Sequence, residues 1–243
     1  MRTLYSIIPV YNEVDALTSL LKNLRALVLP ANFTLHIVAI DDGSTDGSKE
    51  ILEQQNGRDL TVITHVKNQG IPQTYTDAIC SLKARLLPND IVMIVEGDGT
   101  SDLACIPAFL EEIEKGSDIV IASREAPGGA YVRFPLYRIM GSKIVNLLLR
   151  VLWHIAGATD YTIFYRAYRG ALIQKLLEGN LNFCANKSFA ANGELLLLLE
   201  KFSPRVSEVP LRYDYGLKKG PSKMKLFATL KEYIRLTYLY HGQ

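Results

Sequence analysis

The sequence is poor in cysteine: its three cysteines, Cys80, Cys105 and Cys184, are far apart and form no CxxC pair. This excludes a disulfide scaffold and a cysteine-based zinc site. It also lacks an apolar run of the ~18 residues that a membrane-spanning helix needs. Pro9 interrupts the start before a signal-peptide core can form. We therefore expect a cytoplasmic protein that can touch a membrane face without crossing it.

No large excess of charge of one sign is present, because 27 Lys and Arg face 25 Asp and Glu. The balance is uneven, however: residues 1–123 hold 9 basic and 17 acidic residues, and residues 124–243 hold 18 and 8. This asymmetry suggests metal or carboxylate chemistry beside a surface that receives anions. The basic residues are spread among apolar helices rather than gathered in an arm, so we expect phosphates or an anionic membrane as partners and no nucleic acid.

The 243 residues, 48% of them apolar, fit one large globular domain. Strand-like and helix-like segments alternate in the first half. The expected strands there are 3–9, 34–41, 60–65, 90–95 and 117–122, and the expected helices are 13–27, 45–54, 71–86 and 103–115. The second half should add helices 134–157, 170–178, 187–201 and 223–240 and strands 161–168 and 205–213. This order predicts an α/β fold in which helices flank a mostly parallel sheet, with a helical C-terminal elaboration.

Polar motifs follow the first two predicted strands, at the sheet edge where ligands gather in such folds. The first is PVYNE at residues 9–13, where we expect Asn12 to cap the next helix while Tyr11 and Glu13 remain available to a ligand. The second is DDGSTDG at 41–47, an acidic turn whose carboxylates can accept hydrogen bonds from a base and a ribose. Neither GxGxxG nor a P-loop occurs, so dinucleotide and P-loop sites lack support.

A third motif, EGDGTSD at residues 96–102, follows the strand predicted at 90–95. Carboxylates two residues apart point to one side of an extended chain. Glycines beside them let a diphosphate approach the backbone closely. Mg²⁺ and Mn²⁺ prefer oxygen ligands of this kind and usually share them with substrate phosphates. The motif therefore predicts a divalent metal site.

These three motifs, at this order and spacing, resemble family 2 glycosyltransferases of the GT-A fold. Within that family the chain is most similar to dolichol-phosphate mannose synthases and bacterial polyprenyl-phosphate glycosyltransferases. The similarity covers about residues 3–225 and includes ASR at 122–124, DYTIFYRAYR at 160–169, EVP at 208–210 and GPSK at 220–223. It implies a single GT-A domain over residues 1–243, with a nucleotide-sugar and metal half at 1–123 and an acceptor half at 124–243.

The resemblance also implies roles for individual residues. Nucleotide contacts are implied for Pro9, Tyr11, Glu13, Asp41 and Asp42. The Mg²⁺ or Mn²⁺ ion would bind Glu96 and Asp98, with Gly97 beside the diphosphate. Arg124 would lie near the diphosphate or sugar, and Lys223 would close over phosphate, so Asp98, Arg124 and Lys223 are the expected catalytic residues.

Three positions depart from the family pattern. Glu96 stands where the family usually has Asp, so this carboxylate reaches about one methylene further. Residues 163–165 read IFY instead of Ser-Gly-Phe. Leu217 replaces the Arg three residues before the last loop glycine, and its neighbours Lys218 and Lys219 can supply only point charges.

The implied reaction is an inverting transfer of a sugar from a UDP- or GDP-linked donor to a polyprenyl phosphate, which needs no general base because the acceptor is already anionic. A saccharide hydroxyl acceptor would need one, and Asp102 and Glu194 are the candidates. A third reading is a relative that binds nucleotide or lipid without turnover, because of Glu96 and Leu217. The amphipathic segment 223–240 fits either an interfacial membrane helix or a helix packed on the domain, and for 144–158 we expect core packing.

Overall fold

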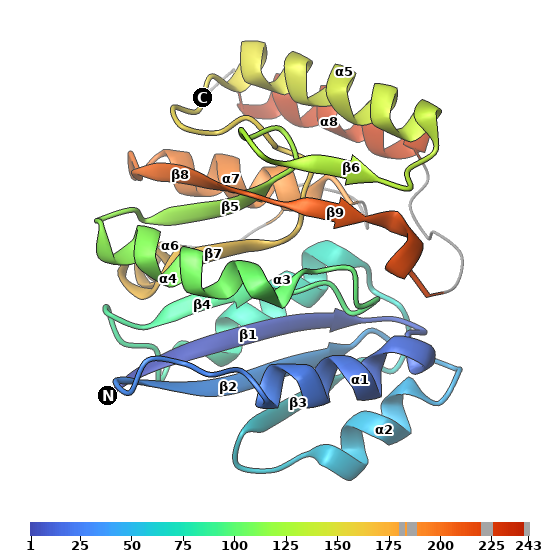
Figure 1. Cartoon of the computed structure of the whole chain (residues 1–243), viewed down its shortest axis with the longest axis vertical. Helices are drawn as coiled ribbons and strands as arrows, with labels where there is room; N and C mark the ends of the chain where they lie inside the picture. The colour runs from blue at the N-terminus through green and yellow to red at the C-terminus, as the bar shows by residue number, and fades with distance from the viewer. Residues whose placement is uncertain (180–182, 184–188, 220–225, 241–243) are drawn as a thin grey trace.

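The computed structural model describes residues 1–179, 183, 189–219 and 226–240. This part of the chain folds around a seven-stranded sheet with the order β3-β2-β1-β4-β7-β5-β8 (Figure 1). The strands are β1 (Arg2–Val10), β2 (Phe33–Asp41), β3 (Leu60–Thr64), β4 (Ile91–Ile94), β5 (Ile119–Ser123), β7 (Arg166–Arg169) and β8 (Val206–Pro210). All neighbouring pairs are parallel except those of β7 with β4 and β5. The mostly parallel sheet is confirmed.

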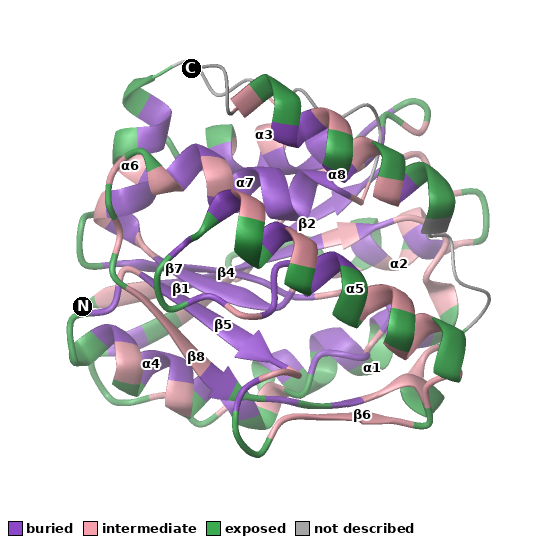
Figure 2. Cartoon of the chain, turned by 90° about the horizontal axis from the view of Figure 1, so that it is seen from above, coloured by how far each residue is buried: buried purple, intermediate pink, exposed green. Residues whose placement is uncertain are grey.

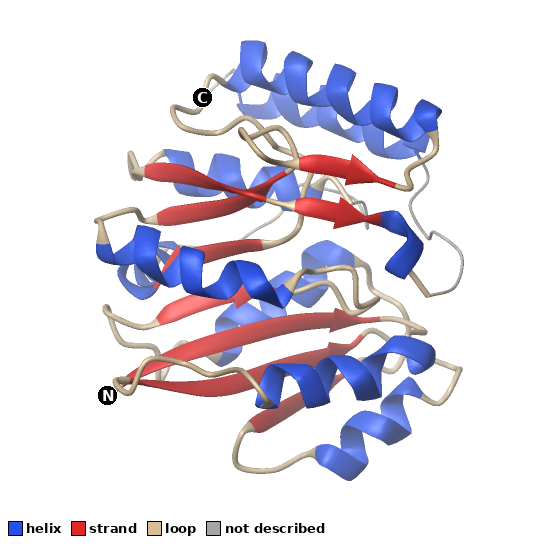
Figure 3. Cartoon of the chain, viewed as in Figure 1, coloured by secondary structure: helices blue, strands red, loops and turns tan. Residues whose placement is uncertain are grey.

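Helices cover both faces of this sheet (Figure 3). They are α1 (Val14–Arg25), α2 (Ser48–Gln55), α3 (Ile71–Ser81), α4 (Ile106–Glu114), α5 (Leu136–Trp153), α6 (Gly170–Glu178), α7 (Ala191–Glu200) and α8 (Leu226–Tyr240). Helices α3, α6 and α7 contact one another on one face, whereas α1 and α4 lie on the other. Helices α5 and α8 pack side by side beyond the β8 edge. The expected helical elaboration of the second half is therefore present.

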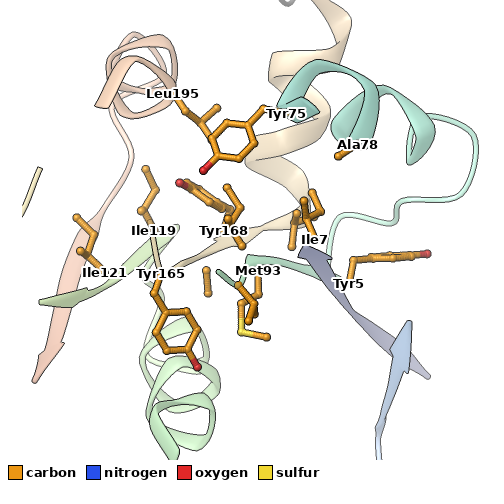
Figure 4. Packing of buried hydrophobic residues seen from close by; sticks show 14 of the residues in the cluster. Tyr5, Ile7, Tyr75, Ala78, Met93, Ile119, Ile121, Tyr165, Tyr168 and Leu195 are labelled. Atoms are coloured by element: carbon orange, nitrogen blue, oxygen red, sulfur yellow. The ribbon is translucent and has the colours of Figure 1, made fainter. Parts of the chain in front are cut away.

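The core is continuous across the sheet. Strands β4 and β5 are buried along their whole length, as expected for parallel strands covered on both faces. Aromatic side chains fill both sides: Tyr75 and Tyr168 lie on the side of α7, and Tyr165 lies on the side of α4 (Figure 4). There Tyr165 meets Phe109 of α4 edge-to-face, with ring centroids 4.9 Å apart. This packing holds the strand ends that carry the motifs in place.

The strand expected at 161–168 is shorter than predicted. Two side chains bind the backbone of its first half. Asn146 Oδ1 accepts from Tyr161 N–H at 3.0 Å, and Asp160 Oδ1 accepts from Thr162 N–H at 3.3 Å. Side-chain acceptors of this kind compete with the strand ladder. Only Arg166–Arg169 pairs as a strand.

The strand expected at 205–213 is two strands that belong to different sheets. Strand β8 ends at Pro210, which has no N–H to donate. The chain then continues as β9 (Arg212–Asp214), which pairs with β6 (Ala130–Val132), a strand that was not expected, in a separate two-stranded sheet. This change of sheet directs residues 212–219 toward the carboxyl end of β4.

Helix α5 is only half buried, so the expectation of core packing for 144–158 is partly wrong. Val145, Leu149 and Trp153 face the domain, whereas Ile144 and Leu147 are 60% and 62% exposed. Helix α8 packs against the same region through its buried residues, and Trp153 Nε1 donates to Thr237 Oγ1 at 3.0 Å. The expected residues 223–225 of this helix lie outside the described part.

Candidate active site

The first and third motifs meet where the strand order reverses. The chain runs from β1 to β2 on one side of β1, while β4 lies on the other side, and ligands of such sheets bind at this point. Gly97 makes the meeting close: a Cβ there would lie 2.6 Å from Pro9 O and 3.6 Å from Glu13 Cγ. Only glycine fits this contact, so the acidic loop lies directly against residues 9–13.

The first and second motifs are joined by hydrogen bonds. Asn12 has a left-handed backbone (φ 54°), a conformation that asparagine tolerates. Its Oδ1 accepts from Thr45 N–H at 2.8 Å, and its own N–H donates to Ser44 Oγ at 3.0 Å. The residue that precedes α1 is Glu13, so the prediction that Asn12 caps this helix is wrong. Asn12 instead holds the 41–47 turn beside Tyr11.

The two aspartates of the second motif differ. Asp42 is buried and saturated: Oδ1 lies 2.7 Å from His65 Nδ1 and accepts from Gln69 N–H, and Oδ2 accepts from Gly70 N–H at 2.8 Å. Asp41 is also buried, but only Oδ1 is bonded, to Ser44 N–H at 3.1 Å. Its Oδ2 has no hydrogen-bond partner among the described residues. Asp42 therefore organises the loop after β3, whereas Asp41 keeps one buried oxygen without a partner among the described residues.

The third motif forms a compact acidic centre. Asp98 Oδ1 accepts from Thr100 Oγ1 at 2.5 Å and from Thr100 N–H at 3.1 Å. The hydroxyl of Tyr213, from β9, donates to Thr100 Oγ1 at 2.8 Å and lies 3.4 Å from Glu96 Oε1. The ammonium of Lys218 pairs with Asp98 Oδ2. Residues from both halves of the chain thus surround the two carboxylates.

Electrostatics distinguish the two carboxylates of this centre. Burial removes water from the Glu96 carboxyl, and Asp98 places a negative charge near it. Together they raise the pKa of the Glu96 carboxyl to about 8, although the positive charges of Lys218 and Arg124 oppose the shift. Burial raises the pKa of the Tyr213 hydroxyl well above its ordinary value, so this group stays a donor. A positive charge brought to the centre would restore the ionised form of Glu96.

Arg124 is held inside the protein. It follows β5, and its Nε and Nη2 donate to the two oxygens of Asp160 at 2.8 and 2.7 Å. Burial would raise the pKa of the Asp160 carboxyl, but the charge and hydrogen bonds of Arg124 outweigh it and hold that pKa below its ordinary value. The guanidinium lies 5.9 Å from the ring centroid of Tyr213. Arg124 thus lies beside Tyr213, within cation–π range of its ring.

Three side chains of this centre received no role from the motifs alone. Thr100 lies within the third motif but looked like part of a turn. Tyr213 is one of 13 tyrosines, and nothing in its local sequence marks it. Lys218 stood out only as a charge beside the departure at Leu217. The expected Lys223 lies outside the described residues.

Comparison with known proteins identifies the family. The signature of glycosyl transferase family 2 matches residues 6–182. The chain belongs to this family. Undecaprenyl-phosphate mannosyltransferase from Micrococcus luteus is 28% identical to this glycosyltransferase, with 92% of this chain and 88% of the relative covered. Polyprenol monophosphomannose synthase from Mycolicibacterium smegmatis is 27% identical, with 90% and 79% covered.

A longer relative and a solved structure complete the comparison. Undecaprenyl-phosphate 4-deoxy-4-formamido-L-arabinose transferase from Edwardsiella ictaluri is 27% identical over 88% of this glycosyltransferase, which spans 63% of that protein. Glucosyl-3-phosphoglycerate synthase from Mycobacterium tuberculosis, solved with Mn²⁺, UDP and glucosyl-3-phosphoglycerate, superposes with a TM-score of 0.72. The identity is 16%, and 99% of this chain and 80% of the other are covered. The fold is therefore that of GT-A glycosyltransferases.

Proposed function

We propose that this glycosyltransferase moves a sugar from a UDP- or GDP-linked donor to a polyprenyl phosphate, with inversion, at a membrane surface. The observation that carries the proposal is the contact of the 96–98 loop with Pro9 and Glu13 at the reversal of strand order. There a nucleoside bound along the ends of β1 and β2 would place its diphosphate at the acidic centre. The names of the relatives that match most of the chain support the lipid phosphate acceptor.

The acidic centre fits a divalent cation that shares its ligands with the donor. Glu96 and Asp98 would hold Mg²⁺ or Mn²⁺, with the Thr100 hydroxyl beside them. Within the described ranges, no three His, Cys, Asp or Glu side chains gather as a self-sufficient metal site. A pair of carboxylates suits Mg²⁺, which usually takes one or two carboxylates plus substrate phosphates. When bound, the cation would supply charge neutralisation to the departing diphosphate.

The chain's own residues would orient the donor. Gly97 lets the 96–98 loop pack directly against the backbone of Pro9, which would bring its carboxylates next to the donor. Asp41, whose buried Oδ2 has no partner among the described residues, would accept a hydrogen bond from the nucleoside, and Tyr11 and Glu13 would line the same edge. This changes the expectation for Asp42, whose carboxylate is already bonded on both oxygens.

The two candidate general bases are both engaged in the structure. Asp102 Oδ1 accepts from Ala104 N–H at 3.0 Å and so caps the 3-10 turn η1 (Leu103–Cys105). Glu194, on buried α7, accepts from the Tyr240 hydroxyl of α8 at 2.7 Å. A phosphate acceptor is already anionic and needs no base, so this arrangement favours lipid phosphate over a saccharide hydroxyl. For such an acceptor we expect a single displacement, and thus inversion.

The exposed side of α5 supports docking on an anionic membrane (Figure 2). Large apolar side chains recur along this side at helical spacing: Leu136, Tyr137, Met140, Ile144, Leu147 and Val151. The helix contains no acidic residue and carries Arg138, Lys143 and Arg150. Apolar and basic groups combined in this way are typical of helices that lie in the membrane interface. In the part of the chain that the structure describes, no helix is long and apolar enough to cross a bilayer.

A transfer assay tests the proposal. The protein is incubated with UDP- and GDP-sugars, Mn²⁺ or Mg²⁺ and a short polyprenyl phosphate, and the glycosylated lipid is measured by mass spectrometry. Asp98→Asn should lower turnover by at least about 10²-fold, because it removes a charge that stabilises the departing diphosphate. Asp102→Asn, a nearby carboxylate that only caps a turn, should retain activity.

Other outcomes would favour the other readings. Transfer to a saccharide but to no lipid phosphate, with loss of activity in Asp102→Asn or Glu194→Gln, would indicate a hydroxyl acceptor. Nucleotide binding without any transfer or donor hydrolysis would indicate a relative that has lost turnover. An unchanged rate in Asp98→Asn would contradict the assignment of the acidic centre.

A further inference from the structure

A lysine from the second half of the chain lies on the acidic centre of the first half. Lys218 follows the 3-10 turn η2 (Tyr215–Leu217), and its ammonium pairs with Asp98 Oδ2 across 120 positions of sequence. The two side chains are only 13% and 10% exposed. An ion pair this well shielded is favourable only while both partners remain together, because either charge alone loses its hydration.

The charges that surround Lys218 come from two loops. The carboxylates of Asp98, Glu13 and Glu96 are the acidic groups that act on the Lys218 ammonium. Lys218 therefore places its positive charge where carboxylates from the ends of β1 and β4 converge. It neutralises part of the negative charge that a divalent cation would neutralise in the same place.

We propose that Lys218 is the internal counter-ion of Asp98 and that it transfers to the donor diphosphate when a divalent cation binds the acidic centre. The inference rests on the proposed function, because it takes residues 96–98 as the place where metal and diphosphate meet. Lys218 and a divalent cation repel each other, so they cannot share Asp98 at close range. One must leave for the other to bind.

This exchange makes metal and nucleotide binding cooperative. Displacement of Lys218 by a cation alone leaves the ammonium without its carboxylate partner in a shielded position, which weakens metal binding. A diphosphate offers oxygens that accept the displaced ammonium and removes that penalty. By thermodynamic linkage, each ligand then raises the affinity for the other by the same factor. The bare protein should therefore bind the metal poorly.

The residue type suits this movement. A lysine carries a compact charge on a flexible four-carbon stem, so it can follow an anion from one position to another. Its neighbour Lys219 is exposed and has the same charge. Lys219 therefore provides a matched control for any effect of net charge.

The test measures Mn²⁺ affinity rather than transfer. Free Mn²⁺ is followed by electron paramagnetic resonance during titration of the full chain, without nucleotide and with UDP or GDP. We expect Lys218→Met to bind Mn²⁺ alone about tenfold more tightly than the wild type, and the enhancement by diphosphate to fall by about the same factor. Lys219→Met and Lys218→Arg, which leave a charge near Asp98, should behave as the wild type.

Each result bears on the inference. Equal Mn²⁺ affinity in Lys218→Met and wild type would overturn it while leaving the metal site intact, and so would an equal gain in Lys219→Met. If no variant binds Mn²⁺ in the presence of UDP or GDP, both the inference and the proposed metal dependence are overturned. Circular dichroism confirms folding, and Lys218→Gln provides the same comparison if Lys218→Met does not fold.

Discussion

At the scale of single residues, the site depends on which polar groups are already satisfied. Asp42 and Arg124 look equally available in the sequence, yet the first binds His65 and the loop after β3, and the second binds Asp160. Buried polar groups are costly without partners, so both residues are bonded within the protein. Asp41 keeps one buried oxygen without a partner among the described residues, and Asp98 is paired with Lys218.

The Arg124–Asp160 pair leads to a prediction about stability. Asp160→Asn should destabilise the protein by roughly 3–5 kcal/mol at pH 7, because it leaves the Arg124 guanidinium buried without a counter-charge. The pKa of Asp160 is lowered on folding. Its stabilisation is therefore present above the unfolded value, near pH 4, and is lost as the pH falls through the folded value. Urea unfolding measures the free energy of unfolding of both proteins at pH 7 and pH 3. The difference between Asp160→Asn and the wild type should be smaller at pH 3.

The exposed pair of Arg25 and Asp59 is the control for this prediction. Its side chains are 33% and 46% exposed, so Asp59→Asn should cost no more than about 1 kcal/mol at either pH. If Asp59→Asn and Asp160→Asn lose the same free energy of unfolding at pH 7, burial does not make the Arg124–Asp160 pair more important for stability.

At the scale of elements, α5 and α8 each have two distinct sides. One side of α8 buries Tyr233 and Leu236 against the domain, while Phe227 and Tyr238 are exposed. Thus α8 is packed on the domain through one side, and the interfacial interpretation stays a prediction for its exposed side. On α5 the exposed apolar residues run along the whole helix, which is unusual for a surface that faces only water.

Membrane docking through α5 predicts a specific loss. Leu147→Glu should weaken binding to vesicles that contain anionic phosphatidylglycerol by at least about tenfold, since a buried leucine contributes about 2 kcal/mol and the new charge opposes burial. Val28→Glu changes another exposed apolar residue, in the loop before β2, and should have no effect. Co-sedimentation with vesicles measures both variants. Equal binding of Leu147→Glu and wild type would exclude this side of α5 as the docking surface.

At the scale of the whole molecule, the two halves of opposite charge complete one site. The acidic first half supplies the carboxylates at the ends of β1, β2 and β4, and the basic second half returns Tyr213 and Lys218 onto them through β9 and η2. Binding of a donor should therefore stabilise the entire fold, because its contacts join segments that separate on unfolding.

This linkage also provides a way to identify the base. With Mn²⁺ present, the preferred nucleoside diphosphate at 100 times its dissociation constant should add about 2.7 kcal/mol to the free energy of unfolding. For a domain of this size that corresponds to a rise of roughly 5–10 °C in Tm. UDP and GDP are compared by thermal melting of the wild type and of Asp98→Asn. If neither diphosphate raises Tm, the donor site is not where we place it.

The amino-acid sequence alone determined the alternation of strands and helices in the first half and the positions of the three motifs. Both depend on local patterns: apolar periodicity sets the elements, and small or acidic residues mark the strand ends. Since parallel strands end at one edge, motifs 9–13, 41–47 and 96–102 were expected to meet, and they do. Family membership followed from the same motifs.

Only the tertiary structure decided which side chains pair within that site. The pairing of Lys218 with Asp98, the bond of Tyr213 to Thr100 and the saturation of Asp42 by His65 all join segments that no local pattern relates. The crossing of residues 205–214 from one sheet to the other arises from Pro210 and from the strand partner at 130–132. Hydrogen bonds and ion pairs of this kind are chosen by three-dimensional proximity and by the cost of leaving a buried group unpaired.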